Sequence, residues 1–152
     1  MSVEERLAAA GLEIPPVAPP VAVYVPAVRS GSYVYTSGQL PLRDGKLLAV
    51  GKVGGSVTPE VARECAQQCA LNAIAAVRAE LGHLGLVTRV VKAVIFVAST
   101  PDFTGQPQVA NGASELLGVA FGEAGAHARS AVGVSVLPLD APVEVELIVE
   151  VA

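Results

Sequence analysis

Apolar and polar positions alternate with a period of two in two stretches near the C-terminus, residues 128–136 and 143–151. Such alternation is typical of β-strands that bury one face. We expect the two strands to pair as an antiparallel hairpin closed by residues 137–142. The valines and leucine of the pattern would face the core: Val132, Val134, Val136, Val143, Val145, Leu147 and Val149. The opposite face would carry small and charged residues: Arg129, Ala131, Gly133, Ser135, Glu144, Glu146 and Glu150. That face could receive a small ligand or another subunit, or it could be a solvated face with an ordinary Arg–Glu pair.

The N-terminal part of the chain predicts one short helix and several short strands. Ser2 and Glu5 have the spacing of a capping box, and Gly11 is a plausible end of this helix. Residues 15–20 contain four prolines and predict an extended connector. Strands are expected at 24–28 and 32–37, joined near 29–31. A tight turn at 43–46 should precede a short strand at 47–50.

The remaining pattern predicts two long helices on either side of the best strand. Thr58 and Pro59 should begin a helix that ends near Leu81, before Gly82. Its core-facing positions would be Val61, Cys65, Cys69, Ala73, Ile74, Val77 and Leu81. A strand follows at 87–99, and a second helix at 108–122 buries Leu116, Leu117 and Ala120. We therefore predict an α+β fold: one sheet with two long helices on one face, and an open face that subunits would cover.

Composition, charge and the lack of targeting patterns add further expectations. The 152 residues are 52% hydrophobic and only 16% charged, which suggests one domain with apolar surface hidden in an oligomer. The net charge of −4, without a basic run, disfavours a strong nucleic-acid binder. No stretch of 18 apolar residues is uninterrupted, and Lys92 breaks the longest strand-like run, which disfavours a membrane span. The first ten residues lack a signal-peptide pattern, so we expect a cytoplasmic protein.

The cysteines and histidines do not have the spacing of a metal site. Cys65 and Cys69 are four residues apart in the first long helix, and His83 and His127 are distant in sequence. Zinc sites use four ligands in recognisable spacing. We expect core thiols, no metal and no organic cofactor. Neither histidine has an evident catalytic partner in the sequence.

Three motifs occur in an order that resembles the reactive-intermediate deaminase family, also called the YjgF-like or L-PSP family. They are residues 36–41 (TSGQLP), 128–132 (ARSAV) and 137–146, which begins with Leu-Pro and ends with Val-Glu-Val-Glu; Tyr24 lies upstream. The resemblance covers about residues 21–152, so we expect a YjgF-like domain there and an N-terminal helix with a Pro-rich extension at 1–20. It implies a chorismate-mutase-like fold and a homotrimer whose sheets form a central β-barrel. It also implies ligand clefts between subunits.

The same resemblance assigns roles to individual residues. Arg129 matches the arginine that binds the substrate carboxylate, and Glu144 matches the acidic residue that orients water or leaving ammonia. Tyr24, Ser37 and the amide of Gly38 match the polar wall of the pocket. Ala131 occupies a substrate-binding position where many active members have cysteine, which suggests a distinct branch.

The implied reaction is hydrolysis of enamines and imines of the 2-aminoacrylate type to 2-keto acids and ammonia. A planar guanidinium can bind a carboxylate through two hydrogen bonds, and a glutamate can transfer the protons that hydrolysis requires. Two alternatives stay open: a non-catalytic trimeric binder of small keto or imino acids, and an endoribonuclease or translation inhibitor.

Overall fold

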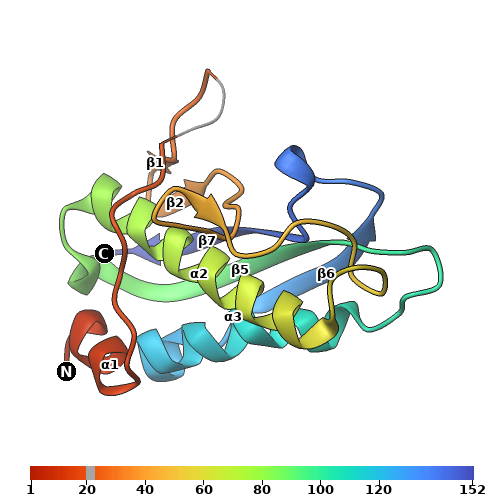
Figure 1. The fold of residues 1–152 in the computed structure, drawn as a ribbon. Helices are drawn as coiled ribbons and strands as arrows, with labels where there is room; N and C mark the ends of the chain where they lie inside the picture. The colour runs from red at the N-terminus through yellow and green to blue at the C-terminus, as the bar shows by residue number, and fades with distance from the viewer. Residues whose placement is uncertain (20–22) are drawn as a thin grey trace.

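The protein folds around a five-stranded sheet with the strand order β1-β2-β7-β5-β6 (Figure 1). This computed structural model describes residues 1–19 and 23–152. The sheet strands are β1 (Ala27–Ser30), β2 (Tyr33–Thr36), β5 (Val87–Ala98), β6 (Ala128–Val134) and β7 (Val143–Val151). All neighbouring pairs are antiparallel except β5 and β6, which are parallel. A separate two-stranded sheet joins β3 (Leu42–Arg43) to β4 (Lys46–Leu47).

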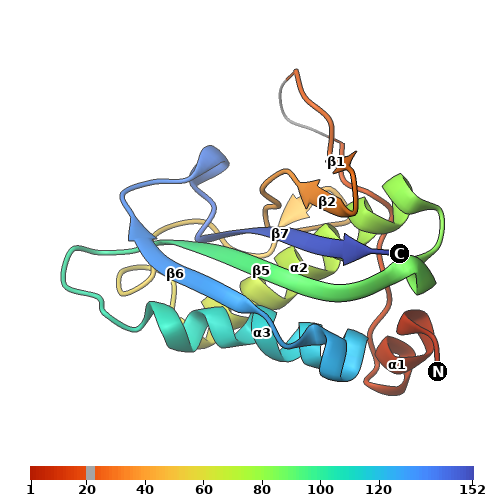
Figure 2. The same cartoon turned by 180° about the vertical axis from the view of Figure 1, so that it is seen from behind.

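Two long helices cover one face of the main sheet, as the sequence predicts. They are α2 (Pro59–Leu81) and α3 (Gln106–Phe121). In Figure 1 α2 lies in front of the strands, and in Figure 2 the strands lie in front of α2 with no helix over them. Short 3₁₀ segments occur at Leu84–Leu86, Gly122–Gly125 and Pro138–Asp140. The α+β layer arrangement is confirmed.

Helix ends and turns follow their local sequence signals. Ser2 and Glu5 form the capping box that begins α1 (Val3–Ala9). The Thr58 hydroxyl accepts a hydrogen bond from the amide of Val61 at the start of α2, and Gly82 ends that helix with φ 79°. Asp44 and Gly45 turn between β3 and β4, with φ 53° and 78°.

The predicted hairpin between the last two strands is wrong. β5 lies between β6 and β7: Arg129 is level with Ala93, and Ala93 is level with Leu147. The chain passes from β5 through α3 into the parallel strand β6, and then crosses to the other side of β5 to form β7. Alternation defines which residues share a face, but it does not identify the neighbouring strand.

The predicted orientation of β6 is also wrong, whereas that of β7 is correct. Val143, Val145, Leu147 and Val149 are fully or almost fully buried on the helix-covered side. In β6 the residues on that side are Arg129, Ala131 and Gly133, because their partners in β5 are the buried Ala93, Ile95 and Val97. Val132 lies on the open face and is 43% exposed, and Val136 lies beyond the strand and is 62% exposed.

Smaller differences concern the ends of elements and one core position. β1 and β2 begin later than predicted, with the turn at 31–32; β4 ends at Leu47, and α3 begins at Gln106. In α2 the predicted core residues Cys65, Cys69, Ala73, Ile74 and Val77 are buried, while Leu81 is partly buried and Val61 is 38% exposed. Both cysteines are buried in the core, and this burial raises the pKa of the Cys65 thiol to about 11 and also raises that of the Cys69 thiol.

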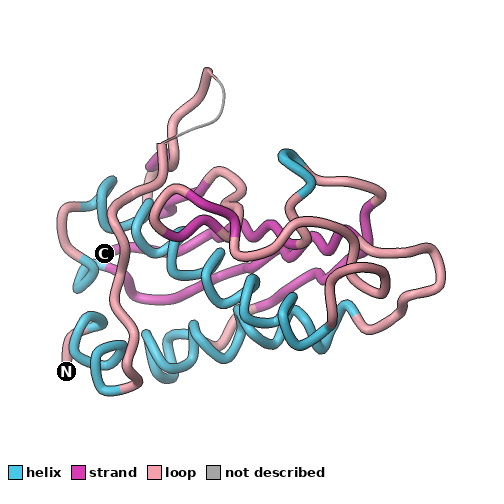
Figure 3. The backbone as a smooth tube through the Cα atoms, in the orientation of Figure 1, coloured by secondary structure: helices cyan, strands magenta, loops and turns pink. Residues whose placement is uncertain are grey.

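Residues 10–19, which follow α1, run past α2 as a loop (pink in Figure 3). Leu7 of α1 is fully buried, and α1 packs against α3. Part of the predicted proline-rich connector, from residue 20, lies outside the described residues. Among the described residues, no helix is long and apolar enough to cross a membrane.

Candidate active site

A pocket on the chain surface brings together three of the residues singled out in the sequence: Tyr24, Gly38 and Glu144. Tyr24 precedes β1, Gly38 follows β2, and Glu144 is the second residue of β7. The remaining lining is mostly apolar: Ala18, Pro19, Pro26, Gln39, Leu40, Leu42 and Pro138. The polar side chains Tyr24 and Glu144 therefore lie in a lining whose other side chains are apolar except for that of Gln39.

Gly38 is required where it stands because the side chain of Glu144 lies against it. A Cβ at position 38 would be 2.7 Å from Cδ of Glu144 and would overlap its Oε2. The backbone N–H groups of Ser37 and Gln39 donate to Pro26 O and Val145 O, both at 2.8 Å. The N–H of Gly38 has no acceptor in the described part of the chain. Within that part of the chain it is thus a donor without an acceptor, beside the carboxyl group of Glu144.

The Glu144 carboxyl group is suited to proton transfer. It is half-buried, and within the described ranges 1–19 and 23–152 it has neither a hydrogen-bond partner nor an ion-pair partner. Burial is the main cause that raises its pKa above the ordinary carboxyl range, and the nearby charge of Glu146 adds to the shift. A carboxyl group with a raised pKa can exchange protons with a substrate near neutral pH.

Ser37 lies beside the pocket but uses its hydroxyl within the fold. Its Oγ donates to Val25 O at 2.6 Å, and its amide donates to Pro26 O at 2.8 Å. These two bonds hold residues 25 and 26 against the end of β2. The contacts show Ser37 positioning the segment that carries Tyr24; whether it also contacts a ligand stays a prediction.

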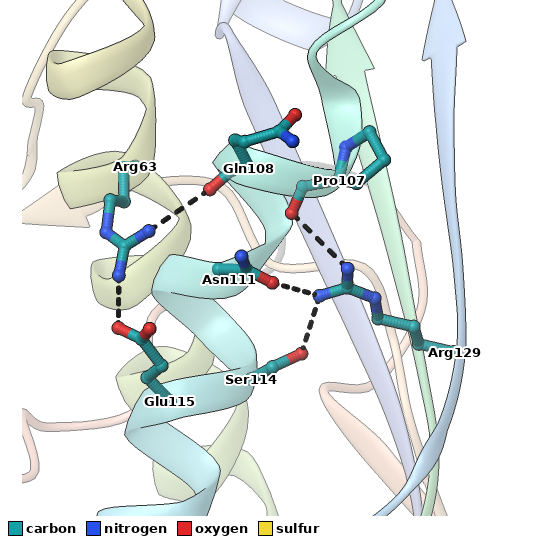
Figure 4. Close-up of polar contacts among 7 residues, drawn as sticks. All are labelled: Arg63, Pro107, Gln108, Asn111, Ser114, Glu115 and Arg129. Atoms are coloured by element: carbon teal, nitrogen blue, oxygen red, sulfur yellow. Dashed lines mark hydrogen bonds and ion pairs between the residues drawn. The ribbon is translucent and has the colours of Figure 1, made fainter.

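Arg129 lies on the other side of the sheet, against α3. Its Nη1 donates to Asn111 Oδ1 at 2.8 Å and to Ser114 Oγ at 3.1 Å, and its Nη2 donates to Pro107 O at 3.3 Å (Figure 4). All three acceptors are neutral, and no carboxylate of the described residues pairs with Arg129. The guanidinium is therefore oriented without being neutralised.

One chain does not bring the two halves of the predicted site together. Arg129 is level with Leu147 across β5, three positions from Glu144, and the odd offset places the two side chains on opposite faces of the sheet. Strand spacing and rise per residue put their Cα atoms roughly 14 Å apart. Ala131 shares the face of Arg129 and is likewise remote from the pocket of Glu144.

Sequence reasoning missed the residues that hold Arg129. Asn111 and Ser114 are three positions apart in α3 and so share a helix face. His127 has a partner that the sequence did not reveal: its Nε2 lies 2.9 Å from Ser114 Oγ, and its Nδ1 lies 2.6 Å from Gly125 O. The spacing of Asn111 and Ser114, with His127 two residues before Arg129, was an available but weak signal.

No group of three or more metal-ligating side chains gathers in residues 1–19 and 23–152. Cys65 and Cys69 are buried in α2. The polar groups that line the pocket include the Tyr24 hydroxyl, the Gly38 amide, the Gln39 side chain and the Glu144 carboxyl.

Comparison with known proteins connects this arrangement to one family. Residues 4–151 match the family described as YjgF/chorismate mutase-like, putative endoribonuclease. Protein TCP17 of Trypanosoma cruzi is 46% identical over 141 residues, which are 92% of this chain and 88% of that protein.

Two crystal structures extend the comparison to three dimensions. Protein Atu1372 of Agrobacterium tumefaciens superposes with a TM-score of 0.93 and 44% identity, over 99% of this chain and 92% of that one. Escherichia coli TdcF with bound serine superposes with a TM-score of 0.66 and 25% identity, over 91% of this chain and 94% of that one.

Proposed function

This chain belongs to the YjgF/chorismate mutase-like family, and we propose that it is a homotrimeric enzyme that hydrolyses reactive imines of small 2-amino acids. A 2-aminoacrylate-type enamine first tautomerises to its imine. Water then adds to the imine carbon, the C–N bond breaks, and the products are a 2-keto acid and ammonia. This balance requires neither an oxidant nor a cofactor.

The observation that carries the proposal is the half-buried carboxyl group of Glu144 beside the amide of Gly38, neither of which has a hydrogen-bond partner among residues 1–19 and 23–152. In its ionised form Glu144 accepts a proton from the attacking water, and in its protonated form it delivers one to the leaving nitrogen. The raised pKa brings the two forms closer in population near neutral pH. The Gly38 N–H and the Tyr24 hydroxyl can orient the reacting groups.

The Arg129 guanidinium supplies the group that holds the substrate. Its bonds to α3 occupy both N–H groups of Nη1 and one of Nη2. The N–H of Nε and the second N–H of Nη2 have no acceptor among the described residues, and Nε and Nη2 form an edge through which arginine binds a carboxylate with two hydrogen bonds. TdcF, which binds serine in its crystal structure, is a relative with a small carboxylate-bearing ligand.

The site then forms between subunits, because a small imino acid cannot reach both Arg129 and Glu144 of one chain. The open sheet face carries large apolar side chains that water otherwise contacts: Val28, Tyr33, Tyr35 and Val132. Three sheets packed through these faces would form the central barrel. Arg129 of one subunit and Glu144 of the next would complete each cleft.

The test is to generate the imine in place, with a serine/threonine dehydratase or an amino-acid oxidase, and to follow keto-acid release. The protein should accelerate release above the spontaneous rate, and Glu144→Gln should abolish that acceleration. Release at the spontaneous rate with the folded trimer would reject the enzymatic proposal. If the protein nevertheless binds pyruvate, the non-catalytic binder becomes the better description.

The family description favours one further candidate, RNA cleavage. The net charge of −4 opposes it, since binding to phosphates requires clustered cations. A purified Arg129→Ala variant that still cleaves RNA would place any such activity at another site or in a contaminant.

A further inference from the structure

Arg129 is the end of a hydrogen-bonded chain that begins at Gly125. A carbonyl oxygen only accepts, so the 2.6 Å contact between His127 Nδ1 and Gly125 O places a proton on Nδ1. In the neutral imidazole Nε2 is then the acceptor, and the Ser114 hydroxyl, 2.9 Å away, donates to it. The same Ser114 oxygen accepts from Nη1 of Arg129 at 3.1 Å.

This proton order leaves every member of the chain satisfied. The contacts therefore favour the tautomer of His127 that carries its proton on Nδ1.

The helix that carries Ser114 is itself held from its other side. Arg63 of α2 donates to Gln108 O at 3.4 Å and forms an ion pair with Glu115 (Figure 4). A Cβ at Gly112 would lie 3.0 Å from the backbone carbon of Arg63, so the two helices meet closely there. Asn111 and Ser114 thus project from a fixed surface toward β6.

We propose that Ser114 and His127 are positioning residues, which hold the Arg129 guanidinium in place for a substrate carboxylate while leaving its charge free. This inference rests on the proposed function and assigns roles to two further residues. Its physical basis is that neutral acceptors orient a guanidinium without pairing its positive charge with a negative one. A carboxylate at position 114 would orient it equally well but would compete with the substrate.

Substitutions at position 114 separate positioning from a structural role. Ser114→Ala removes the acceptor and should raise both the Kd for pyruvate and the KM for the imine about 3- to 10-fold, with kcat nearly unchanged. Ser114→Thr keeps the hydroxyl and should restore wild-type values. Ser114→Asp should bind pyruvate more weakly than Ser114→Ala while melting no lower than wild type, because the new carboxylate pairs with Arg129. A merely structural role would lower the melting temperature of Ser114→Ala and leave its Kd for pyruvate unchanged.

His127 is tested by spectroscopy and by a matched histidine. The ¹⁵N resonances of His127 should identify the tautomer with the proton on Nδ1, and His127→Phe should raise KM as Ser114→Ala does. His83, whose Nδ1 accepts from the Gly85 amide at 2.9 Å, provides the control, and His83→Asn should leave KM unchanged.

The outcomes distinguish this inference from the proposed function. Suppose that the wild-type protein turns over the imine, but that Ser114→Ala and His127→Phe leave the Kd for pyruvate and the KM for the imine unchanged. This result overturns the positioning role alone. A proton on Nε2 of neutral His127 does the same. A wild-type trimer that neither binds pyruvate nor releases keto acid overturns both.

Discussion

Arg129 and Glu144 lie on opposite faces of one sheet, three positions out of register, with β5 between their strands. Each is accompanied by its own polar groups: Asn111 and Ser114 at the arginine, and Gly38 and Tyr24 at the glutamate. The sheet therefore separates a group that can hold a carboxylate from a group that can move a proton. This separation determines how the two halves are to be tested.

Arg129→Lys tests the half that holds the carboxylate. Lysine keeps the positive charge but has one nitrogen, so it cannot hold Asn111 and Ser114 and also present two donors to a ligand. The loss of a charge-assisted hydrogen bond should lower kcat/KM about tenfold to a few hundredfold. Steady-state kinetics measure the loss, and circular dichroism should show the fold intact. Unchanged turnover in this variant would contradict the assignment of Arg129 to the substrate carboxylate.

Gly38→Ala tests the contact between Gly38 and Glu144. The new methyl group must displace the carboxyl group, whose Cδ would lie only 2.7 Å away, so activity should fall at least about tenfold. Gly118→Ala is a suitable control, because a Cβ there meets nothing within 4 Å on a helix. This control substitution should stabilise the protein by about 0.5–1 kcal/mol, since alanine has a higher helix propensity than glycine. Thermal melting and imine turnover of both variants check the pair. Full activity in Gly38→Ala would mean that the position of Glu144 is unimportant for the reaction.

The stability of the protein should depend on pH through Glu144. Its pKa is raised in the folded state, so between the ordinary carboxyl pKa and the raised value the folded protein keeps a proton that the unfolded chain has lost. Stability therefore falls as pH rises through this interval, and the penalty is complete above it. Glu144→Gln removes the penalty. The unfolding free energy of this variant relative to that of wild type should therefore be larger at about pH 7 than at about pH 4.

Denaturant unfolding at both pH values measures this gain. Glu13→Gln removes a negative charge from an exposed position and provides the control. An equal difference between wild type and Glu144→Gln at both pH values would mean that the folded state does not perturb Glu144.

The sequence was most informative where local signals decide the structure. Thr58, Pro59 and Gly82 define α2 because capping and the left-handed φ of glycine are properties of the neighbouring residues alone. The faces of β7 follow from alternation, since its valines meet the helices.

The errors concern relations between distant segments. In β6 the valines face away from the helices because α3 packs closely on that strand, where Arg129, Ala131 and Gly133 share the helix-covered side. The second error concerns which strands pair. β7 pairs with β5 and β2, and a period-two alternation does not identify the strands beside it. In the predicted hairpin, with residue 136 paired to residue 143, Arg129 would be level with Glu150, six positions from Glu144. The observed register reduces this to three and adds an intervening strand.

The cluster around Arg129 illustrates the same limit at the level of the site. Ser114 and His127 are thirteen residues apart in sequence, and only the passage from α3 into β6 brings them into contact. Gly38 and Glu144 meet because the backbone of Gln39 pairs with that of Val145 beyond the end of β2. Neither contact is specified by the residues next to it in the chain.

Subunit complementation tests whether the two halves meet across an interface. The protein should first scatter light as a particle of about three times its 15.4 kDa chain mass. Arg129→Ala and Glu144→Ala should each be inactive alone. In a cyclic trimer that mixes the two, one cleft in three receives Arg129 from one subunit and Glu144 from its neighbour. Equal mixing by unfolding and refolding should therefore restore up to about a quarter of wild-type activity.

The matched control mixes Arg129→Ala with the double variant Arg129→Ala/Glu144→Ala, which contains no intact arginine and should stay inactive. Recovery in the first mixture but not in the second requires clefts built from two chains, because no single chain in either mixture has both groups. Mixed trimers can be verified by a mass tag on one variant. Verified mixed trimers without activity would mean that one chain supplies the whole site or that Glu144 does not act on the substrate. A stable monomer would remove the interface and the site together.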